Sequence, residues 1–307
     1  MTLALFSRRP RGFPVASAAV SKLGLEETPR LKGISVVVPV RDNPEGLARL
    51  GTWWRGLAED ERPLELIVID DASQQPVEFV AEAVRILQGG GRGPACARNV
   101  GWRAAKGPWV AFLDSDCLPA VGWPASFAAG WRGEVAVQGA VRAMGKDWLS
   151  SYYESQGVLR PMAWTEDGRP QYLISANCLV HRAALDRVGG FSERFPLAAG
   201  EDVDLGLRLS QLGALRWCAE ARVTHDFEPS LRAFFRRFLR YGRGNRMLAD
   251  GQSDSTGDFF SPRPFLPLLR RPENFLLAGL AFAALGVGWL LEGHGIRRSS
   301  NDLQEGE

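Results

Sequence analysis

The chain has 307 residues, of which 45% are hydrophobic and 23% are charged. This composition is typical of a folded protein with a full hydrophobic core, organised as one large domain or as one domain with an appendage. The formal net charge is only +2, so no nucleic-acid partner is expected.

The cysteines and the N-terminal segment both indicate the cytoplasm. Cys96, Cys117, Cys178 and Cys218 are far apart and form no C-x-x-C pair. This spacing argues against a zinc knuckle and a disulfide framework, and for a reducing compartment. Residues 1–32 have basic residues after a short apolar start and no long apolar core. We expect a flexible tail there rather than a secretory signal.

Apolar segments alternate with helix-forming segments over the first half of the chain. The expected strands are 34–40, 64–69 and 109–113, and the expected helices are 44–57, 77–85 and 94–105. This alternation predicts an α/β fold with a mostly parallel central sheet flanked by helices. Ligands of such sheets bind at the carboxyl ends of the strands, so the polar residues that follow these strands should line one crevice.

The second half of the chain is less regular. The expected strands are 135–141 and 172–180, and a helix is expected at 201–212. A basic amphipathic helix is expected within 229–250, with leucine and aromatic residues on one face and arginines on the other. Its arginines suit an anionic membrane or a phosphate-bearing lipid, delivery of one arginine to a bound diphosphate, or plain exposure to solvent.

Segment 262–298 is expected to form a C-terminal helical extension. Residues 275–291 form an unbroken apolar stretch, which as a helix reaches about 25 Å, slightly less than a hydrocarbon core of ~30 Å. A membrane-associated helix and a hydrophobic docking helix both fit it. Arginine pairs at 270–271 and 297–298 flank it on both sides, so its orientation stays open. Residues 299–307 are expected to be disordered.

Two aspartates follow the third expected strand. Asp114 and Asp116 flank Ser115 at the end of a buried apolar run, where like charges repel and desolvation is costly. A divalent cation would neutralise them, and Mg²⁺ or Mn²⁺ commonly bridges such a carboxylate to a diphosphate. Taken alone, the triplet also fits a solvated turn.

Two further clusters are expected near the same edge of the sheet. Asp70 and Asp71 end the second strand, and a carboxylate there either accepts hydrogen bonds from a base or ribose or simply begins a turn. The glycine-rich turn 89–93 leads into a helix that carries Arg98 near its start. An arginine at that place can meet a base or a phosphate, and the helix N-terminus favours anions.

Five short motifs occur in one order along the chain. They are Val38-Pro39-Val40, Ile69-Asp70-Asp71-Ala72-Ser73, Ala97-Arg98-Asn99, Phe112-Leu113-Asp114-Ser115-Asp116 and Gly200-Glu201-Asp202. The set resembles the family 2 glycosyltransferases, which have the GT-A fold, over residues 34–225. The resemblance implies a catalytic domain at 33–228, a nucleotide-sugar donor such as a UDP-sugar, a divalent metal ion (Mn²⁺ or Mg²⁺) and inverting transfer of a sugar, of the hexosyltransferase type.

The resemblance also implies how the donor would be held. Asp71 would contact the base, and Asp114 would lie near the ribose. The rest of the nucleotide-sugar pocket would be formed by Pro39, Val40, Asp70, Arg98, Asn99 and Ser115.

Metal binding and acid–base chemistry are implied at four positions. Asp116 would ligate the metal, and His225 matches a histidine that completes the metal site in some members. Glu201 and Asp202 form the acidic pair before the acceptor site, with Asp202 as the base that deprotonates the acceptor hydroxyl.

Other classes of protein fit the sequence less well. A sugar nucleotidyltransferase needs a glycine-rich basic loop after the first strand, and a dinucleotide oxidoreductase needs G-x-G-x-x-G there; the chain has VRDNP at 40–44. A catalytically silent nucleotide-sugar-binding protein or membrane scaffold would not need both Asp116 and Asp202. Lipids, glycans, small molecules and peptides all stay open as acceptors. The expected location is the cytoplasmic face of the membrane.

Overall fold

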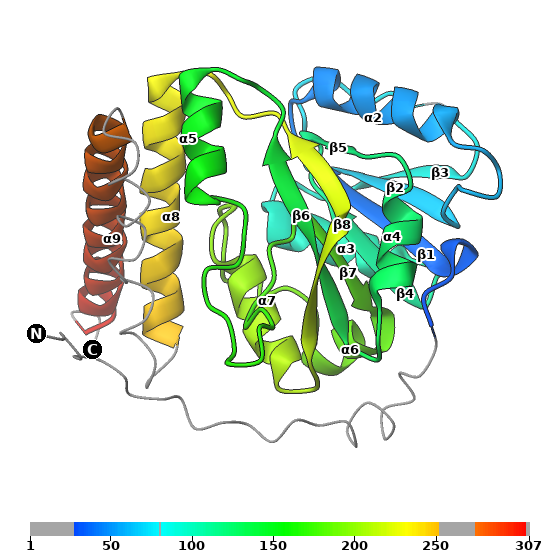
Figure 1. Ribbon diagram of the computed structural model, residues 1–307. Helices are drawn as coiled ribbons and strands as arrows, with labels where there is room; N and C mark the ends of the chain where they lie inside the picture. Colours follow the sequence, from blue (N-terminus) through cyan, green and yellow to red (C-terminus); the bar gives the residue numbers. More distant parts are fainter. Residues whose placement is uncertain (1–27, 80, 252–273, 305–307) are drawn as a thin grey trace, which may run out of the picture.

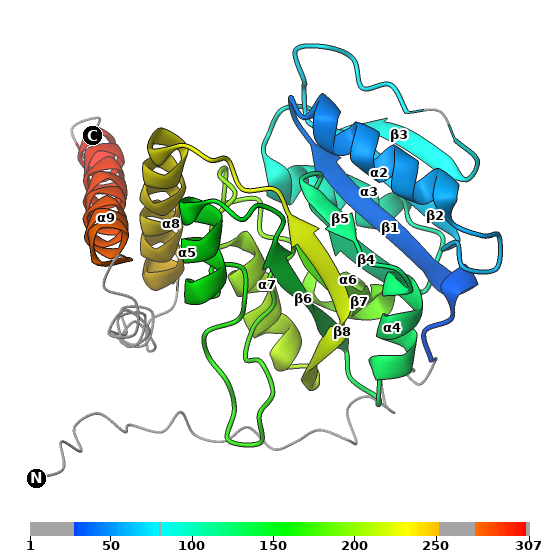
Figure 2. The same ribbon diagram turned by 45° about the horizontal axis from the view of Figure 1, so that its top comes forward.

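The computed structural model describes residues 28–79, 81–251 and 274–304, with side chains up to residue 293. An eight-stranded sheet in the order β3-β2-β1-β4-β7-β6-β8-β5 forms its centre. Helices cover both faces of the sheet, and a pair of long helices stands at one side (Figures 1 and 2). The expected α/β class, with a flanked central sheet and a C-terminal helical extension, is confirmed.

The first half of the chain forms the parallel part of the sheet. Its strands are β1 (Ile34–Val40), β2 (Glu65–Asp70), β3 (Val84–Gln88) and β4 (Trp109–Leu113). All residues of β2 and β4 are buried, which explains their continuous apolar runs. The helices between them are α2 (Pro44–Gly56) and α3 (Pro94–Ala104), and α2 is capped by the Asn43 side chain.

The helix expected at 77–85 is wrong. Residues 84–88 instead form β3, an edge strand that pairs in parallel with β2 from Leu66↔Val84 to Asp70↔Gln88. The apolar residues of this segment fit a helical period and a strand period equally well over so short a run. The open backbone edge of β2 decides between them, because it offers hydrogen-bond partners that a helix cannot use.

The second half of the chain adds antiparallel pairing. Its strands are β5 (Cys117–Pro119), β6 (Ala136–Ala143), β7 (Asn177–His181) and β8 (Leu215–His225). β7 is antiparallel to both β4 and β6, β5 is antiparallel to β8, and β6 is parallel to β8. The strand expected from residue 172 begins only at Asn177. The helices are α4 (Trp123–Gly130), α5 (Trp148–Gln156), α6 (Arg182–Val188) and α7 (Glu201–Ser210).

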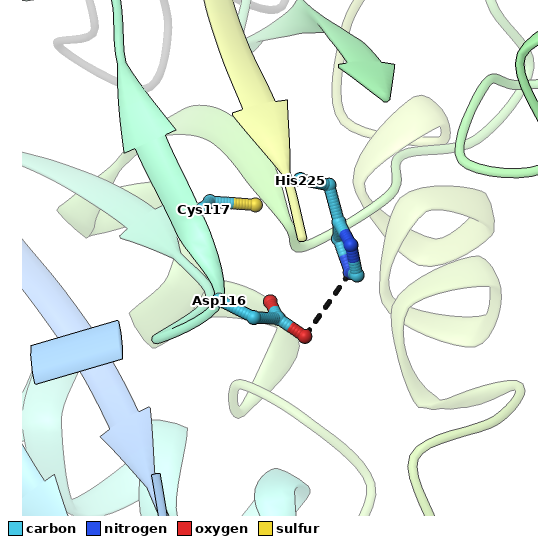
Figure 3. Close-up of side chains that lie close together, drawn as sticks. All are labelled: Asp116, Cys117 and His225. Atoms are coloured by element: carbon cyan, nitrogen blue, oxygen red, sulfur yellow. Dashed lines mark ion pairs between the residues drawn. The ribbon is translucent and has the colours of Figure 1, made fainter. Parts of the chain in front are cut away.

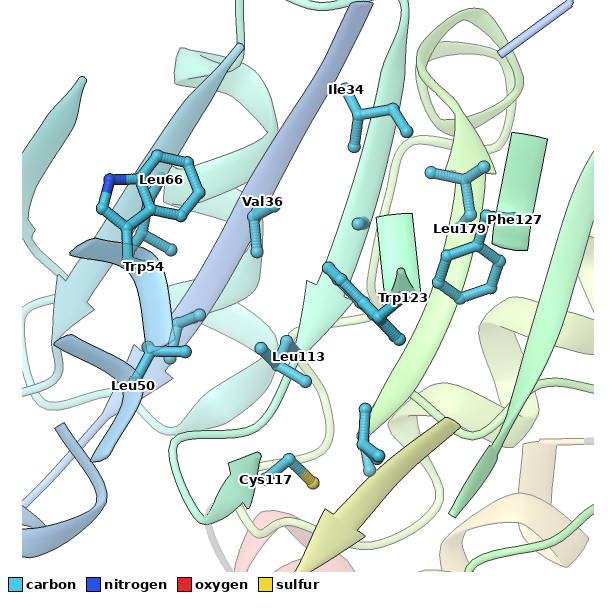
Figure 4. Close-up of a cluster of buried hydrophobic side chains, with 14 of the residues drawn as sticks. Ile34, Val36, Leu50, Trp54, Leu66, Leu113, Cys117, Trp123, Phe127 and Leu179 are labelled. Carbon is cyan, nitrogen blue, oxygen red and sulfur yellow. The ribbon is translucent and has the colours of Figure 1, made fainter. Parts of the chain in front are cut away.

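The core has one apolar cluster on each face of the sheet. On one face, α2 contributes Leu50 and Trp54, and α4 contributes Trp123 and Phe127, all fully or almost fully buried (Figure 4). On the other face, α3, α6 and α7 pack against residues such as Val37. Both faces of the sheet are thus closed, and the polar loops collect at the strand ends.

A third apolar cluster joins two long helices to the part of the protein that contains the sheet. α8 (Leu231–Gly251) and α9 (Phe275–Gln304) lie side by side (Figures 1 and 2). Phe234 and Phe238 of α8 are buried together with Tyr153 of α5. α9 continues to Gln304, beyond the end expected near residue 298, whereas 1–27, 262–273 and 305–307 lie outside the described residues.

Within the described part of the chain, one helical stretch is long and apolar enough to cross a membrane. It is Phe275–Gly293, with a mean hydropathy of 1.9, and it includes the apolar run expected at 275–291.

Candidate active site

Polar side chains collect where β1, β2 and β4 end and where β8 returns to them. Asp71 follows β2, the Asp114–Asp116 triplet lies between β4 and β5, and His225 ends β8. α7 begins nearby with Glu201 and Asp202. The structure therefore brings residues from both halves of the chain to one edge of the sheet.

Asp71 presents one carboxylate oxygen without a partner. Its Oδ2 accepts a hydrogen bond from the Gly93 backbone N–H at 2.9 Å. Its Oδ1 is buried and has no hydrogen-bond partner within the described ranges. The backbone of Gly93, at φ 95°, is in the left-handed region that glycine tolerates. The glycine-rich turn thus fixes the orientation of Asp71.

Asp70, Asn99 and Ser115 are held by local contacts. Asp70 Oδ1 accepts from the Ser73 backbone N–H at 2.9 Å, which stabilises the turn after β2. The Asn99 amide donates to the Phe191 carbonyl at 2.9 Å, and its Oδ1 accepts from the Trp102 indole and from the Phe191 N–H. The Ser115 hydroxyl accepts from Asn43 at 3.1 Å. Pro39 and Val40 lie at the end of β1.

A groove of about 670 Å³ lies beside this edge of the sheet. The N-terminal part of α2 forms one wall and residues 73–79 form the other, with Asp42 and Asn43 between them. Asp71, Asp114, Asp116 and Asp202 do not line it, so we do not equate it with the reaction centre. Asn43 connects the two places through its hydrogen bond to Ser115.

Arg98 joins the Asp114–Asp116 segment to the start of α7. Its guanidinium is almost completely buried and donates to Asp114 Oδ1 at 2.7 Å and to Glu201 Oε1 at 2.9 Å. A buried arginine with two carboxylate partners is rigidly oriented. The two residues that it joins are far apart in the chain, so their proximity has no local sequence signal.

Glu201 and Asp202 have different surroundings although they are neighbours. Burial, and then the Asp202 charge, raises the pKa of Glu201 to about 7, and Arg98 opposes this shift. Burial also raises the pKa of Asp202, against Arg98 and two backbone N–H groups. Those groups belong to Ser175 and Val203, at 3.1 and 2.8 Å. Glu201 is fully buried and Asp202 only half-buried, so Asp202 is the more accessible carboxylate.

Asp116, Cys117 and His225 lie close enough together to hold a metal ion, and they are called the metal cluster below. One potential ligand atom from each residue lies within 4.8 Å of the others, and His225 Nε2 is 3.2 Å from Asp116 Oδ2 (Figure 3). Asp116 Oδ1 and His225 Nδ1 are buried without a hydrogen-bond partner among the residues that the structure describes. An orphaned buried carboxylate oxygen is costly, and a cation bound between Asp116 and His225 would satisfy it.

The protonation states of the cluster also fit a cation. Burial lowers the pKa of His225 to about 3, and nearby Arg237 adds to this effect, so the imidazole is neutral and able to ligate. Burial, followed by the Asp114 charge, raises the pKa of Asp116 to about 7, a cost that a cation would remove. Burial and then Asp116 also raise the pKa of the Cys117 thiol well above its usual range.

Cys117 is expected to be dispensable for metal binding, since a protonated, buried thiol is a poor ligand. Cys117→Ala should leave the Mn²⁺ affinity within about threefold of the wild type, and should lower the unfolding free energy by about 1 kcal/mol through lost packing. Isothermal titration with Mn²⁺ and denaturant unfolding measure the two effects. A loss of Mn²⁺ binding in a folded Cys117→Ala protein would make the thiol a ligand.

Arg237 was singled out by no motif, and the structure places it beside the metal cluster. Its guanidinium centre lies 5.1 Å from the Phe227 ring and 5.6 Å from the Tyr153 ring. His225 stacks on the same Phe227 ring, with the two ring centroids 4.2 Å apart. The sequence pattern does not distinguish Arg237 from the other arginines of α8. The packing of the phenylalanine face of the helix determines which arginine points inward.

The fold is of the GT-A type, with a cluster of polar side chains at one edge of the α/β sheet. Residues 35–194 match the sequence profile of glycosyl transferase family 2. The chain is 35% identical over 243 residues to the pre-mycofactocin glycosyltransferase of Mycobacterium tuberculosis, covering 74% of this chain and 50% of that protein. The chain thus belongs to glycosyl transferase family 2, as expected, and spans about half the length of this curated relative.

Solved structures share the fold. The mannosyltransferase PcManGT from Pyrobaculum calidifontis, in complex with GDP-Man and Mn²⁺, has a TM-score of 0.51 at 17% identity, over 92% of this chain and 85% of that chain. GalNAc-T7 with UDP, GalNAc and Mn²⁺ has a TM-score of 0.54 at 17% identity, over 90% of this chain and 58% of that chain. These similarities confirm the GT-A fold.

Proposed function

We propose that the protein transfers a sugar from a nucleoside-diphosphate sugar to an acceptor hydroxyl, with inversion and with a divalent metal ion. One observation carries the proposal: a cluster that could hold a cation and a separate half-buried carboxylate, Asp202, lie at the same sheet edge. Arg98 links the two places, because it binds Asp114 and also Glu201, the neighbour of Asp202. Membership of the family supports it.

The donor nucleotide is held by residues after β1, β2 and β4. The unpartnered Oδ1 of Asp71 accepts a hydrogen bond from the base, and Asp114 lies near the ribose. Pro39, Val40 and Ser115 complete the pocket. Three further residues act on the pocket indirectly. Asp70 holds the turn after β2, Arg98 holds Asp114, and Asn99 holds the segment at Phe191.

Asp116 and His225 are the residues that would hold Mn²⁺ or Mg²⁺. When bound, such an ion supplies positive charge that offsets the charge developing on the nucleoside diphosphate as it leaves. The orphaned Asp116 Oδ1 and the neutral imidazole of His225 are the donor atoms suited to it.

Asp202 acts as the base that takes the proton of the acceptor hydroxyl as its oxygen attacks the anomeric carbon. The backbone N–H groups of Ser175 and Val203 hold its carboxylate in place. Glu201 does not act as the base, because it is fully buried against Arg98. Attack from the face opposite the leaving group inverts the anomeric configuration.

Arg237 is expected to strengthen donor binding, because a cation fixed beside the metal cluster attracts the diphosphate. Arg237→Met should raise the KM for the nucleotide-sugar by about 10- to 100-fold, whereas Arg236→Met removes an exposed charge from the same helix and should leave KM unchanged. Steady-state kinetics with varied donor distinguish the two variants. Equal effects of the two would assign the role to net charge rather than to Arg237.

A thermal-shift screen of nucleotide-sugars, with and without Mn²⁺, tests the proposed function. We expect one donor class to stabilise the protein, with a larger shift when Mn²⁺ is present, and slow Mn²⁺-dependent hydrolysis of that donor. No stabilisation by any donor, or the same shift in excess EDTA, would contradict the metal-dependent mechanism. Donor binding without hydrolysis or transfer would favour a silent binding protein.

The same proposal places the protein in the cytoplasm, at the membrane. The described cysteines, Cys96, Cys117, Cys178 and Cys218, are all free and buried, which suits a reducing compartment.

A further inference from the structure

Between Phe275 and Leu291, one side of α9 is apolar and faces outward. Its exposed large side chains, here called the outer α9 face, are Phe275, Leu276, Phe282, Val287, Leu290 and Leu291, between 42% and 65% exposed. The opposite side is buried against α8 through Leu277, Ala281 and Ala284. A surface helix of a soluble domain carries polar side chains outward, and residues 275–291 contain no charged one.

α9 is joined to α8 along most of its described length. The two helices run in the same direction, since Gly242 meets Leu285 and Arg246 meets Trp289 one turn later (Figure 1). A Cβ at Gly242 or Gly288 would overlap a backbone carbonyl of the other helix. The backbones therefore touch, and the pair forms one unit.

α8 cannot enter the hydrocarbon core of a membrane together with α9. Residues 231–249 contain six arginines and no acidic residue, and each arginine at the centre of a bilayer costs about 2.5–3.5 kcal/mol. The arginines next to α9 include Arg243, paired with Glu292 at 2.7 Å, and Arg246, over the Trp289 ring at 5.3 Å. α8 is also fastened to the catalytic part through Phe234 and Phe238.

We propose that α9 lies in the plane of an anionic lipid bilayer rather than across it. The outer α9 face is immersed at the boundary between headgroups and acyl chains. The charge of α8 selects an anionic surface, with the exposed Arg232 and Arg236 available to lipid phosphates. The proposal does not depend on the sugar-transfer reaction.

Vesicle co-sedimentation of the full chain tests the surface. Phosphatidylcholine vesicles with phosphatidylglycerol should bind the protein, and vesicles without it, or high salt, should bind much less. The double variant Leu276→Glu/Leu290→Glu should lower the partition coefficient at least about tenfold. The control Val121→Glu/Met162→Glu adds the same charge at apolar side chains that are 98% and 55% exposed, and should bind as the wild type does.

Probe depth distinguishes the in-plane from the spanning arrangement. Leu276→Cys and Leu290→Cys, each labelled with an environment-sensitive fluorophore, should report the same shallow depth. The four natural cysteines are buried, so the label reacts at the introduced cysteine. A spanning helix would separate the two labels by about 20 Å of depth. That result would overturn the proposal, as would wild-type vesicle binding by the double glutamate variant. Absence of vesicle binding, with a dimer that Leu276→Glu/Leu290→Glu dissociates, would assign the outer α9 face to a second copy.

Discussion

Replacement of Asp202 by asparagine is expected to lower kcat for sugar transfer by about 10³-fold while nucleotide-sugar binding survives. Asparagine keeps the size of the side chain and one oxygen that can accept the Ser175 N–H. It cannot take a proton from the acceptor. Donor binding is expected to persist, because Arg98 contacts Asp114 and Glu201 directly and Asp202 only through its charge.

The matched control lies two residues further along α7. Asp204 pairs with Arg208 at 2.6 Å and with Arg194 at 3.2 Å, so Asp204→Asn changes the same charge and should retain transfer. The Kd for the donor and the turnover of both variants decide the question. Wild-type turnover by Asp202→Asn would place the base elsewhere.

The pH dependence of transfer follows from the same assignment. A base acts in its ionised form, and burial raises the pKa of Asp202 above its ordinary value. Activity should therefore fall as the pH is lowered through this raised pKa, at a higher pH than for an exposed aspartate.

Replacement of Asp116 by asparagine is expected to have opposite effects on the metal-free and the metal-loaded protein. Burial raises the pKa of Asp116 to about 7, so its ionised form costs folding free energy above that pH. Asp116→Asn should thus leave the metal-free protein as stable as the wild type, or more stable, at pH 8. The gain should shrink as the pH falls below about 7, and it should vanish near the ordinary aspartate pKa of 3.8, where the carboxyl is protonated in the unfolded chain as well.

The metal-dependent reaction should be lost in the same variant. Removal of a ligand worth several kcal/mol in the transition state lowers transfer on the order of 10³-fold, and the extra thermal shift given by Mn²⁺ with the donor should disappear. The exposed Asp186 supplies the control, because Asp186→Asn should retain both. A variant that keeps the Mn²⁺-dependent shift would exclude Asp116 as a ligand.

The parallel strands β1, β2 and β4 could be predicted because they are buried on both faces. Continuous apolar runs marked β1, β2 and β4, and the acidic residues after them marked the sheet edge. β3 was missed because an exposed edge strand has no such run. The helices α4, α5 and α6 are short and leave a weak periodic signal.

The contacts within the site depend on tertiary packing. The pairing of Arg98 with Glu201 joins residues 103 positions apart, and no local pattern encodes it. Cys117 reaches the metal cluster only because β5 pairs with the end of β8, opposite His225. Arg237 differs from the neighbouring arginines only because the packing of α8 places it against the Phe227 ring.

The change from parallel to antiparallel pairing at β4 has a consequence for how such a chain can diversify. The strands between Ile34 and Leu113 form one parallel block, whereas β7 and the strands beyond it pair onto the edge of that block. Under the proposed function, recombination near this junction would exchange acceptor preference between relatives without rebuilding nucleotide recognition. The buried guanidinium of Arg98 crosses the junction, so a viable hybrid must inherit a carboxylate at the start of α7 along with it.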